Sequence, residues 1–281
     1  MAIEAGCHGT STRVRMNGTI LETIVDTKRE EVAAAKRSRP LEAVRDAVAE
    51  ADPPRDCYST VASSDEGVRL IAEIKRASPS AGLIRSNFEP AAIARAYAQG
   101  GASALSVLTD RPYFQGDLSY IAAVKAAVAL PVLRKDFMVD DYQVYESRAA
   151  GADAILLIAA VLPAEKIDAW SRLAFDLGMA SLIEVHNEQE LQAVRACASA
   201  DRRSILGINN RDLHAQRTDL DTTRRLAEAL DADTPFVAES GIKTRDNVLA
   251  IQGWGATAIL VGETLMSAED PGGKVRELLG R

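Results

Sequence analysis

The chain has 281 residues, of which 47% are hydrophobic and 26% are charged, the balance of an ordinary globular protein. Its formal net charge of −7 argues against non-specific binding to nucleic acid, which depends on a basic surface. The sequence has no apolar run close to the roughly 20 residues of a membrane span, and its polar start lacks the apolar core of a secretory signal. These features predict a cytoplasmic protein that partners neither nucleic acid nor a membrane.

Cysteine and histidine are too few and too scattered to predict a disulfide framework or a metal site. No two cysteines form a CxxC pair, and no two histidines have HExxH spacing. The residues concerned are Cys7, Cys57, Cys197, His8, His186 and His214. We therefore expect reduced thiols, no metal and no other cofactor.

The first quarter of the chain is predicted to be helical after a polar leader. Residues 1–18 are polar and aperiodic, so we expect them to be loosely ordered. From Thr19, apolar residues recur near helical spacing in TILETIVDTKREEVAAAKR, which predicts an amphipathic helix. Pro40 opens a second short helix, LEAVRDAVAEA, and a polar linker runs from its end to about Gly67. Residues 19–68 are thus predicted to form an N-terminal helical extension.

From Leu70 onward one unit recurs eight times: a short apolar run, a loop and an alanine-rich helical stretch. The eight predicted strands are LIAEIK (70–75), ALSVLT (104–109), PVLRKD (131–136), AILLIA (154–159), SLIEVH (181–186), ILGINN (205–210), PFVAES (235–240) and AILVGE (258–263). Several helical stretches end in a glycine that suits a left-handed cap, at Gly101, Gly151 and Gly255.

Strands that alternate with helices predict a parallel sheet with right-handed crossovers, and eight such units close a barrel. The rival α/β architecture, a doubly wound sheet, usually carries a GxGxxG turn after its first strand. Here RASPSAG follows the first strand instead. The sequence therefore predicts one (β/α)8 TIM barrel over residues 69–281, forming one structural domain with the extension.

Charged and amide side chains gather at the predicted strand ends, where barrels of this kind place their active sites. Residues two apart on a strand share a face, so several of these groups are expected to point into the barrel mouth together. They are Glu73, Lys75, Lys135, Glu184, Asn209, Arg211 and Glu239. Burying so many charges is costly unless they pair or bind a charged ligand, and close neighbours shift one another's pKa values. We therefore expect a catalytic site.

Two further sectors of the mouth have distinct chemistry. Ser240-Gly241 and Gly262-Glu263 follow the seventh and eighth strands, whose loops usually bind phosphate through backbone N–H groups. The fourth strand ends without a polar group, which leaves an apolar sector suited to an aromatic ring. Its candidate residues are Phe114, Phe137 and Leu156 or Ile158, for which ordinary barrel packing is the alternative.

Seven segments, in order and in register, resemble the indole-3-glycerol phosphate synthase family over essentially all of residues 19–270. They are IAEIKRASPSAG (71–82), SVLTDRPYFQGDL (106–118), PVLRKDF (131–137), LIEVHNEQEL (182–191), GINNRDL (207–213), VAESGI (237–242) and ILVGETLM (259–266). The resemblance implies a carboxy-lyase of tryptophan biosynthesis that acts on a small phosphorylated molecule. Its reaction would be ring closure of 1-(o-carboxyphenylamino)-1-deoxyribulose 5-phosphate with loss of carbon dioxide and water.

The resemblance also implies roles for the catalytic set. Lys135 would be the acid that protonates the carbonyl, and Glu184 the base of the dehydration. Lys75 would be a second acid or would hold the carboxylate or phosphate, and the division between the two lysines stays open. Glu73 and Glu239 would orient the lysines and the ribulose hydroxyls.

The substrate contacts follow in the same way, with Asn209 and Arg211 lining the pocket. Arg211 and Ser78 are candidates for the anthranilate carboxylate. The phosphate side would comprise Ser240, Gly241, Gly262 and Glu263. The chain departs from the family pattern at Ala77, where some members carry a basic residue, and at Glu263, where a small hydroxyl residue can occur. A carboxylate at position 263 repels phosphate unless it points away, so we expect the backbone N–H to bind there.

Three alternatives stay open on the residues alone. A phosphosugar isomerase such as phosphoribosylanthranilate isomerase needs a cysteine and an aspartate at strand ends, and no cysteine lies at a predicted strand end. A Schiff-base lyase needs Lys135 or Lys75 as a neutral amine, which nearby glutamates oppose. The third alternative is a non-catalytic barrel. A monomer is expected, because no strand edge demands a partner.

Overall fold

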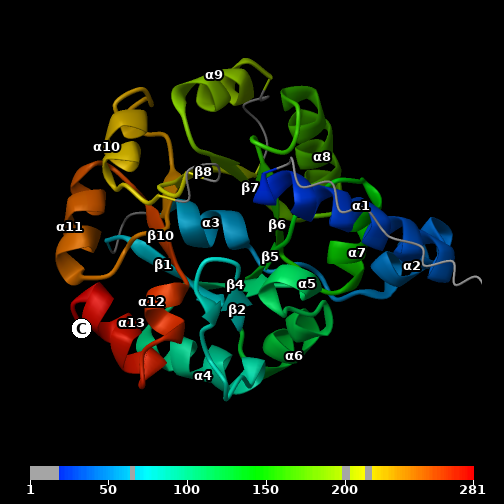
Figure 1. The fold of residues 1–281 in the computed structure, drawn as a ribbon, viewed down its shortest axis with the longest axis horizontal. Helices are drawn as coiled ribbons and strands as arrows, with labels where there is room; N and C mark the ends of the chain where they lie inside the picture. Colours follow the sequence, from blue (N-terminus) through cyan, green and yellow to red (C-terminus); the bar gives the residue numbers. More distant parts are fainter. Residues whose placement is uncertain (1–18, 64–66, 198–202, 213–216) are drawn as a thin grey trace, which may run out of the picture.

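The computed structural model describes residues 19–63, 67–197, 203–212 and 217–281, and these form a closed parallel barrel ringed by helices (Figure 1). The strand order around the barrel is β1-β10-β9-β8-β7-β6-β5-β4. The strands are β1 (Arg69–Ile74), β4 (Ala104–Leu108), β5 (Val132–Lys135), β6 (Ala154–Ile158), β7 (Ala180–Val185), β8 (Ser204–Asn209), β9 (Phe236–Glu239) and β10 (Ala258–Val261). Each coincides with a predicted strand, so the predicted barrel is confirmed. The expected leader lies outside the described residues.

An outer layer of helices covers the barrel strands. It comprises α4 (Pro90–Gly100), α6 (Ser119–Ala127), α7 (Tyr142–Ala149), α8 (Ala164–Asp176), α9 (Glu188–Cys197), α10 (Asp221–Ala227), α11 (Arg245–Gly253) and α13 (Pro271–Leu279). The glycines predicted as left-handed caps have φ near +90°, at Gly101, Gly151 and Gly255. Among the described residues, the helices that are long enough are too polar to cross a membrane.

Short elements shape the loops at the carboxyl ends of the strands. The loop after β1 folds into a hairpin of β2 (Ala77–Ser78) and β3 (Gly82–Leu83). Single helical turns follow β4 and β10, namely α5 (Arg111–Phe114) and α12 (Glu263–Met266).

The opposite end of the barrel is closed by α3 (Cys57–Ala62), in a segment predicted to be a polar linker. Asp56 caps this helix by accepting a hydrogen bond from the Ser59 N–H at 3.0 Å. Cys57 and Val61, one helical turn apart, pack against small residues at the start of the strands, such as Ala104. The linker prediction was wrong because a six-residue helix is too short to show a periodic pattern.

The first two helices extend across the barrel and along its side. In Figure 1, α1 (Ile20–Ser38) runs from over the barrel outward to α2 (Leu41–Glu50), which lies beside α7. Thr19 and Glu22 form a reciprocal capping box that fixes where α1 begins. Val32, Val44 and Tyr142 form the buried contact between this extension and α7.

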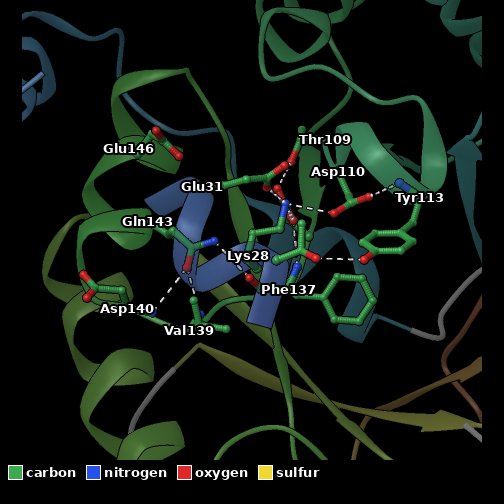
Figure 2. Close-up of polar contacts among 12 residues, drawn as sticks. Lys28, Glu31, Thr109, Asp110, Tyr113, Phe137, Val139, Asp140, Gln143 and Glu146 are labelled. Carbon is green, nitrogen blue, oxygen red and sulfur yellow. Dashed lines mark hydrogen bonds and ion pairs between the residues drawn. The ribbon is translucent and has the colours of Figure 1, made fainter. Parts of the chain in front are cut away.

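A buried ion network fastens α1 to the barrel, and we call Lys28, Glu31, Asp110, Arg134 and Asp136 the docking cluster. Lys28 Nζ lies 2.9 Å from Asp110 Oδ2, 3.0 Å from Asp136 Oδ1 and 2.6 Å from Glu31 Oε2 (Figure 2). Burial alone would lower the pKa of Lys28, but Asp136 and Asp110 hold it above its usual value. Because Asp110 lies two residues after β4 and Asp136 directly follows β5, the cluster fixes α1 against the barrel mouth.

Candidate active site

A cavity of about 550 Å³ opens at the carboxyl ends of the strands. All eight barrel strands, or the residues directly after them, contribute to its lining. Every residue that the sequence predicted for the site lines this one cavity: Glu73, Lys75, Ser78, Phe114, Lys135, Phe137, Leu156, Glu184, Asn209, Arg211, Glu239, Ser240, Gly241, Gly262 and Glu263. The structure therefore brings these residues together, while their chemical roles stay predictions.

Lys135 lies in the barrel lumen between two carboxylates. Its Nζ donates to Glu184 Oε2 at 2.8 Å and to Glu239 Oε2 at 2.6 Å. Lys135 is the last residue of β5, Glu239 is the last residue of β9, and Glu184 is the last but one of β7. Only 14% of the lysine side chain is exposed. Burial alone would lower the pKa of Lys135, but Glu184 and Glu239 raise it above its usual value. The amine is therefore an ammonium at neutral pH.

The two glutamates have different surroundings. Glu184 also accepts a hydrogen bond from Asn209 Nδ2 at 3.0 Å, and His186 Nε2 lies 3.1 Å from the same oxygen. Burial alone would raise the pKa of Glu184, but Lys135 and His186 hold it well below its usual value. Burial raises the pKa of Glu239 to about 7, helped by Glu184 and opposed by Lys135. At neutral pH the first carboxylate is ionised and the second exchanges a proton.

A second ion pair lies at the end of β1, where Lys75, the residue after the strand, has its Nζ 2.7 Å from Glu73 Oε1. Two glycines make room for the glutamates of the lumen. A Cβ at Gly262 would lie 2.1 Å from Glu73 Oε1, and a Cβ at Gly207 would lie 2.4 Å from Glu239 Oε1. Both distances are far below van der Waals contact, so only glycine fits while these carboxylates keep their places.

Polar groups surround the rim of the cavity. Arg211 donates from Nη1 to Ser80 Oγ at 2.9 Å, and its Nη2 lies 3.7 Å from Glu263 Oε2. The Glu263 side chain is half exposed and faces this guanidinium. Ser240 and Gly241 have left-handed backbones, with φ of 67° and 79°. The rim thus presents one guanidinium, hydroxyl groups and a tightly turned backbone.

The remaining wall of the cavity is apolar. The rings of Phe114 and Phe137 lie 6.2 Å apart between centroids, next to Leu156 and Ile158 from β6. Three α1 residues complete this lining and were missed from the sequence: Ile20, Leu21 and Ile24. The helical pattern indicated an apolar face for α1, but no local signal indicates that this face meets a cavity.

Comparison with known proteins agrees with this geometry. A family model described as indole-3-glycerol phosphate synthase matches residues 21–278. The indole-3-glycerol phosphate synthase of Roseiflexus castenholzii is 49% identical over 271 residues, which cover 94% of this chain and 99% of that protein. The protein of the same name from Chromobacterium violaceum is 50% identical over 256 residues, which cover 90% and 95% of the two chains.

Solved structures share the architecture at low identity. The 3-hexulose-6-phosphate synthase from Salmonella typhimurium superposes with a TM-score of 0.61 at 15% identity, covering 75% of this chain and 96% of that one. This likeness shows the barrel fold alone. The family match and the two relatives carry more: the chain belongs to the indole-3-glycerol phosphate synthase family.

Proposed function

We propose that this protein acts as an indole-3-glycerol phosphate synthase in tryptophan biosynthesis. It closes the ring of 1-(o-carboxyphenylamino)-1-deoxyribulose 5-phosphate and releases carbon dioxide and water. The observation that carries the proposal is the Lys135 ammonium, which is held between Glu184 and Glu239 inside a cavity with an apolar wall. An acid and a base lie there side by side, next to a surface suited to an aromatic ring.

Lys135 acts as the acid of the first step. As the aromatic carbon attacks the ribulose carbonyl, the oxygen gains negative charge and takes a proton from a positioned donor. The two glutamates keep Lys135 protonated, so the lysine enters the reaction with that proton in place. Carbon dioxide then leaves from the carbon that formed the new bond.

Glu184 acts as the base of the second step, in which the new hydroxyl leaves as water. A proton must then come off to restore the aromatic pyrrole, and an ionised carboxylate accepts it. Lys75 is another cation at the cavity and assists as an acid or binds an anionic group of the substrate. Glu73 holds Lys75 at 2.7 Å, and Glu239 orients Lys135.

The substrate is bound by three sectors of the cavity. The backbone around Ser240-Gly241 and Gly262-Glu263 accepts the phosphate, because N–H groups bind this anion without a cationic side chain. Arg211 and Ser78 are placed to hold the anthranilate carboxylate. The apolar wall formed by Phe114 and its neighbours holds the aromatic ring.

Two of the alternatives are less compatible with these surroundings. A Schiff-base lyase needs a neutral amine as nucleophile, whereas the glutamates raise the pKa of Lys135. A cysteine-dependent isomerase needs a thiol at the mouth, whereas Cys57 packs at the closed end of the barrel. As parts of the same proposal, the protein works as a monomer in the cytoplasm on a small phosphorylated molecule.

The test is turnover of the synthetic substrate without added metal, followed by indole absorbance and fluorescence. We expect indole from the native protein and a loss of about 10²–10⁴-fold in kcat for Lys135→Ala and for Glu184→Gln. Matched controls are Lys274→Ala and Glu277→Gln, which remove the partners of an ion pair on α13. These controls should keep full activity.

Two outcomes would overturn the proposal. One is a folded native protein that binds the substrate but forms no indole, which would assign the barrel to a different reaction. The other is a covalent adduct trapped with borohydride in the presence of substrate, which would assign the lysine to Schiff-base chemistry.

A further inference from the structure

His186 lies behind Glu184 and does not line the cavity. It follows the last residue of β7, and only 7% of its side chain is exposed. Its Nε2 lies 3.1 Å from Glu184 Oε1, and its Nδ1 lies 3.0 Å from Glu190 Oε2 on α9. The imidazole therefore lies between two carboxylates, one of which is the proposed base.

Nδ1 is hydrogen-bonded to Glu190, whereas Nε2 lies at ion-pair distance from Glu184 Oε1 without the alignment of a hydrogen bond. A neutral imidazole carries one N–H and one lone pair, so it directs a lone pair at one of the two carboxylates. Only the doubly protonated imidazolium presents an N–H to each. The geometry therefore favours a cation at His186.

Glu190 is itself fixed in place. Its Oε2 accepts a hydrogen bond from the backbone N–H of His186 at 2.8 Å, and its Oε1 accepts one from Asn187 Nδ2 at 2.7 Å. The backbone N–H of Glu190 in turn donates to Asn187 Oδ1 at 2.9 Å. Because Glu190 is held by three hydrogen bonds besides its contact with the ring, it sets the orientation of the imidazole.

The two glutamates that bind Lys135 differ in what else they touch. Glu184 has Asn209 and the imidazolium on its second oxygen, whereas Glu239 Oε1 is buried without a hydrogen-bond partner among the described residues. The two carboxylates share Lys135, but Glu239 also faces the negative charge of Glu73. His186 adds to this asymmetry, because it places a second cation against Glu184.

We propose that His186, held by Glu190, is a positioning residue that keeps Glu184 the ionised member of the glutamate pair on Lys135. Glu184 is thereby reserved as the base, and Glu239 is left as the member that exchanges a proton. This inference rests on the proposed function for its kinetic part only.

The electrostatic directions agree with this assignment. The charged groups that face His186 are Glu184 on β7 and Glu190 on α9, and Lys135 lies beyond Glu184. Burial alone would lower the pKa of His186, but the two carboxylates raise it to about 10. The same contact is among the causes that lower the pKa of Glu184.

The kinetic test is the pH dependence of kcat in His186→Gln, which keeps an amide donor and removes the charge. We expect the acid limb to move upward by about 1 pH unit or more. Activity at pH values below the native limb would fall about 10-fold, while activity near pH 9 changes less. Glu190→Gln should move the limb the same way by a smaller amount, and the double variant no further than His186→Gln.

Glu188→Gln is the matched control, because Glu188 lies on the same helix and pairs with Arg225 at the surface. Its acid limb should coincide with that of the native protein. A uniform loss of kcat at every pH in His186→Gln would mean that His186 is only structural and would overturn the inference.

A second measurement needs no turnover, so it separates this inference from the proposed function. The chain has three histidines, so the NMR signals of the His186 ring are assigned by their absence from His186→Gln. We expect this imidazole to stay protonated through neutral pH. Titration near the ordinary value of 6.5 would overturn the inference even if indole forms.

The pH dependence of thermal stability offers a third test of a charged His186. A histidine whose folded-state pKa is raised stabilises the fold below 6.5 and loses that contribution as pH rises to about 10. The Tm of the native protein should therefore fall more steeply between these pH values than the Tm of His186→Gln.

Discussion

Two buried ion clusters in this protein have the same arrangement of charges but different surroundings. In the docking cluster, Lys28 lies 2.9 and 3.0 Å from Asp110 and Asp136. In the lumen, Lys135 lies 2.8 and 2.6 Å from Glu184 and Glu239. Each is a lysine between two carboxylates, yet Lys28 lies buried on a docked helix outside the cavity lining, whereas Lys135 lines the cavity.

The difference is clearest between one carboxylate of each cluster, Asp136 and Glu239. Asp136 also binds Thr109, Arg134 and the Phe137 N–H, and although burial opposes it, the neighbouring cations hold its pKa below the usual value. Glu239 has an oxygen without a hydrogen-bond partner in the part of the chain that the structure describes, and burial raises its pKa to about 7. A carboxylate with every site occupied holds two segments together, whereas one with an open site can exchange a proton.

The largest expected effect comes from removing each lysine in turn. Lys28→Met leaves Asp110 buried without its cation and Asp136 with Arg134 alone, and should cost about 3–5 kcal/mol of unfolding free energy. Lys135→Met should cost clearly less, because Glu239 readily takes a proton and Glu184 lines the cavity beside His186. Urea unfolding measures both. Equal losses, or a larger loss for Lys135→Met, would remove the distinction between the clusters.

An intermediate effect is expected at a glycine of the lumen. Gly262→Ala places a methyl group 2.1 Å from Glu73 Oε1 and so displaces the Glu73–Lys75 pair. We expect kcat/KM to fall about 100-fold, close to 3 kcal/mol. Gly253→Ala is the control, because a Cβ there meets nothing within 4 Å. If Gly262→Ala retains full activity, the position of this pair does not matter for turnover.

The smallest effect on stability is expected from a hydrogen bond beside the docking cluster. Thr27 Oγ1 and the Tyr113 hydroxyl are 2.8 Å apart, which ties α1 to α5. Thr27→Val keeps the shape and removes this hydrogen bond, and we expect a loss of about 1 kcal/mol or less in urea unfolding. A loss as large as that of Lys28→Met would mean that the docking is held by the whole surface rather than by the ion cluster.

The two clusters also differ in how far they can be predicted from sequence. The residues of the lumen can be predicted from the alternation of side chains along strands, which places Glu73 and Lys75, for example, on one face. The docking cluster does not. Lys28 lies in a helix of alternating charges, and nothing local distinguishes it from its exposed neighbour Arg29. Its partners come from loops far along the chain, so only the tertiary structure shows that it is buried.

Other omissions have similar causes. The apolar face of α1 was visible as a pattern, but whether Ile24 meets a core or a cavity depends on where the helix docks. Strand alternation puts His186 on the face of Glu184, two residues earlier, yet its role depends on Glu190, which a turn and the start of α9 bring back to it. The periodicity of a sequence predicts which way side chains point within one helix or strand. It does not predict contacts between elements.

The docking of α1 also has a consequence for the order in which the chain is assembled during synthesis. Asp136 is translated 108 positions after Lys28, from the difference of their numbers, which takes on the order of 10 s on a ribosome. Throughout that interval the lysine stays hydrated and the apolar face of α1 has no surface to cover. The helix α1, made early, is therefore placed only after β5 has emerged, so the wall that it gives the cavity forms long after the helix itself has been synthesised.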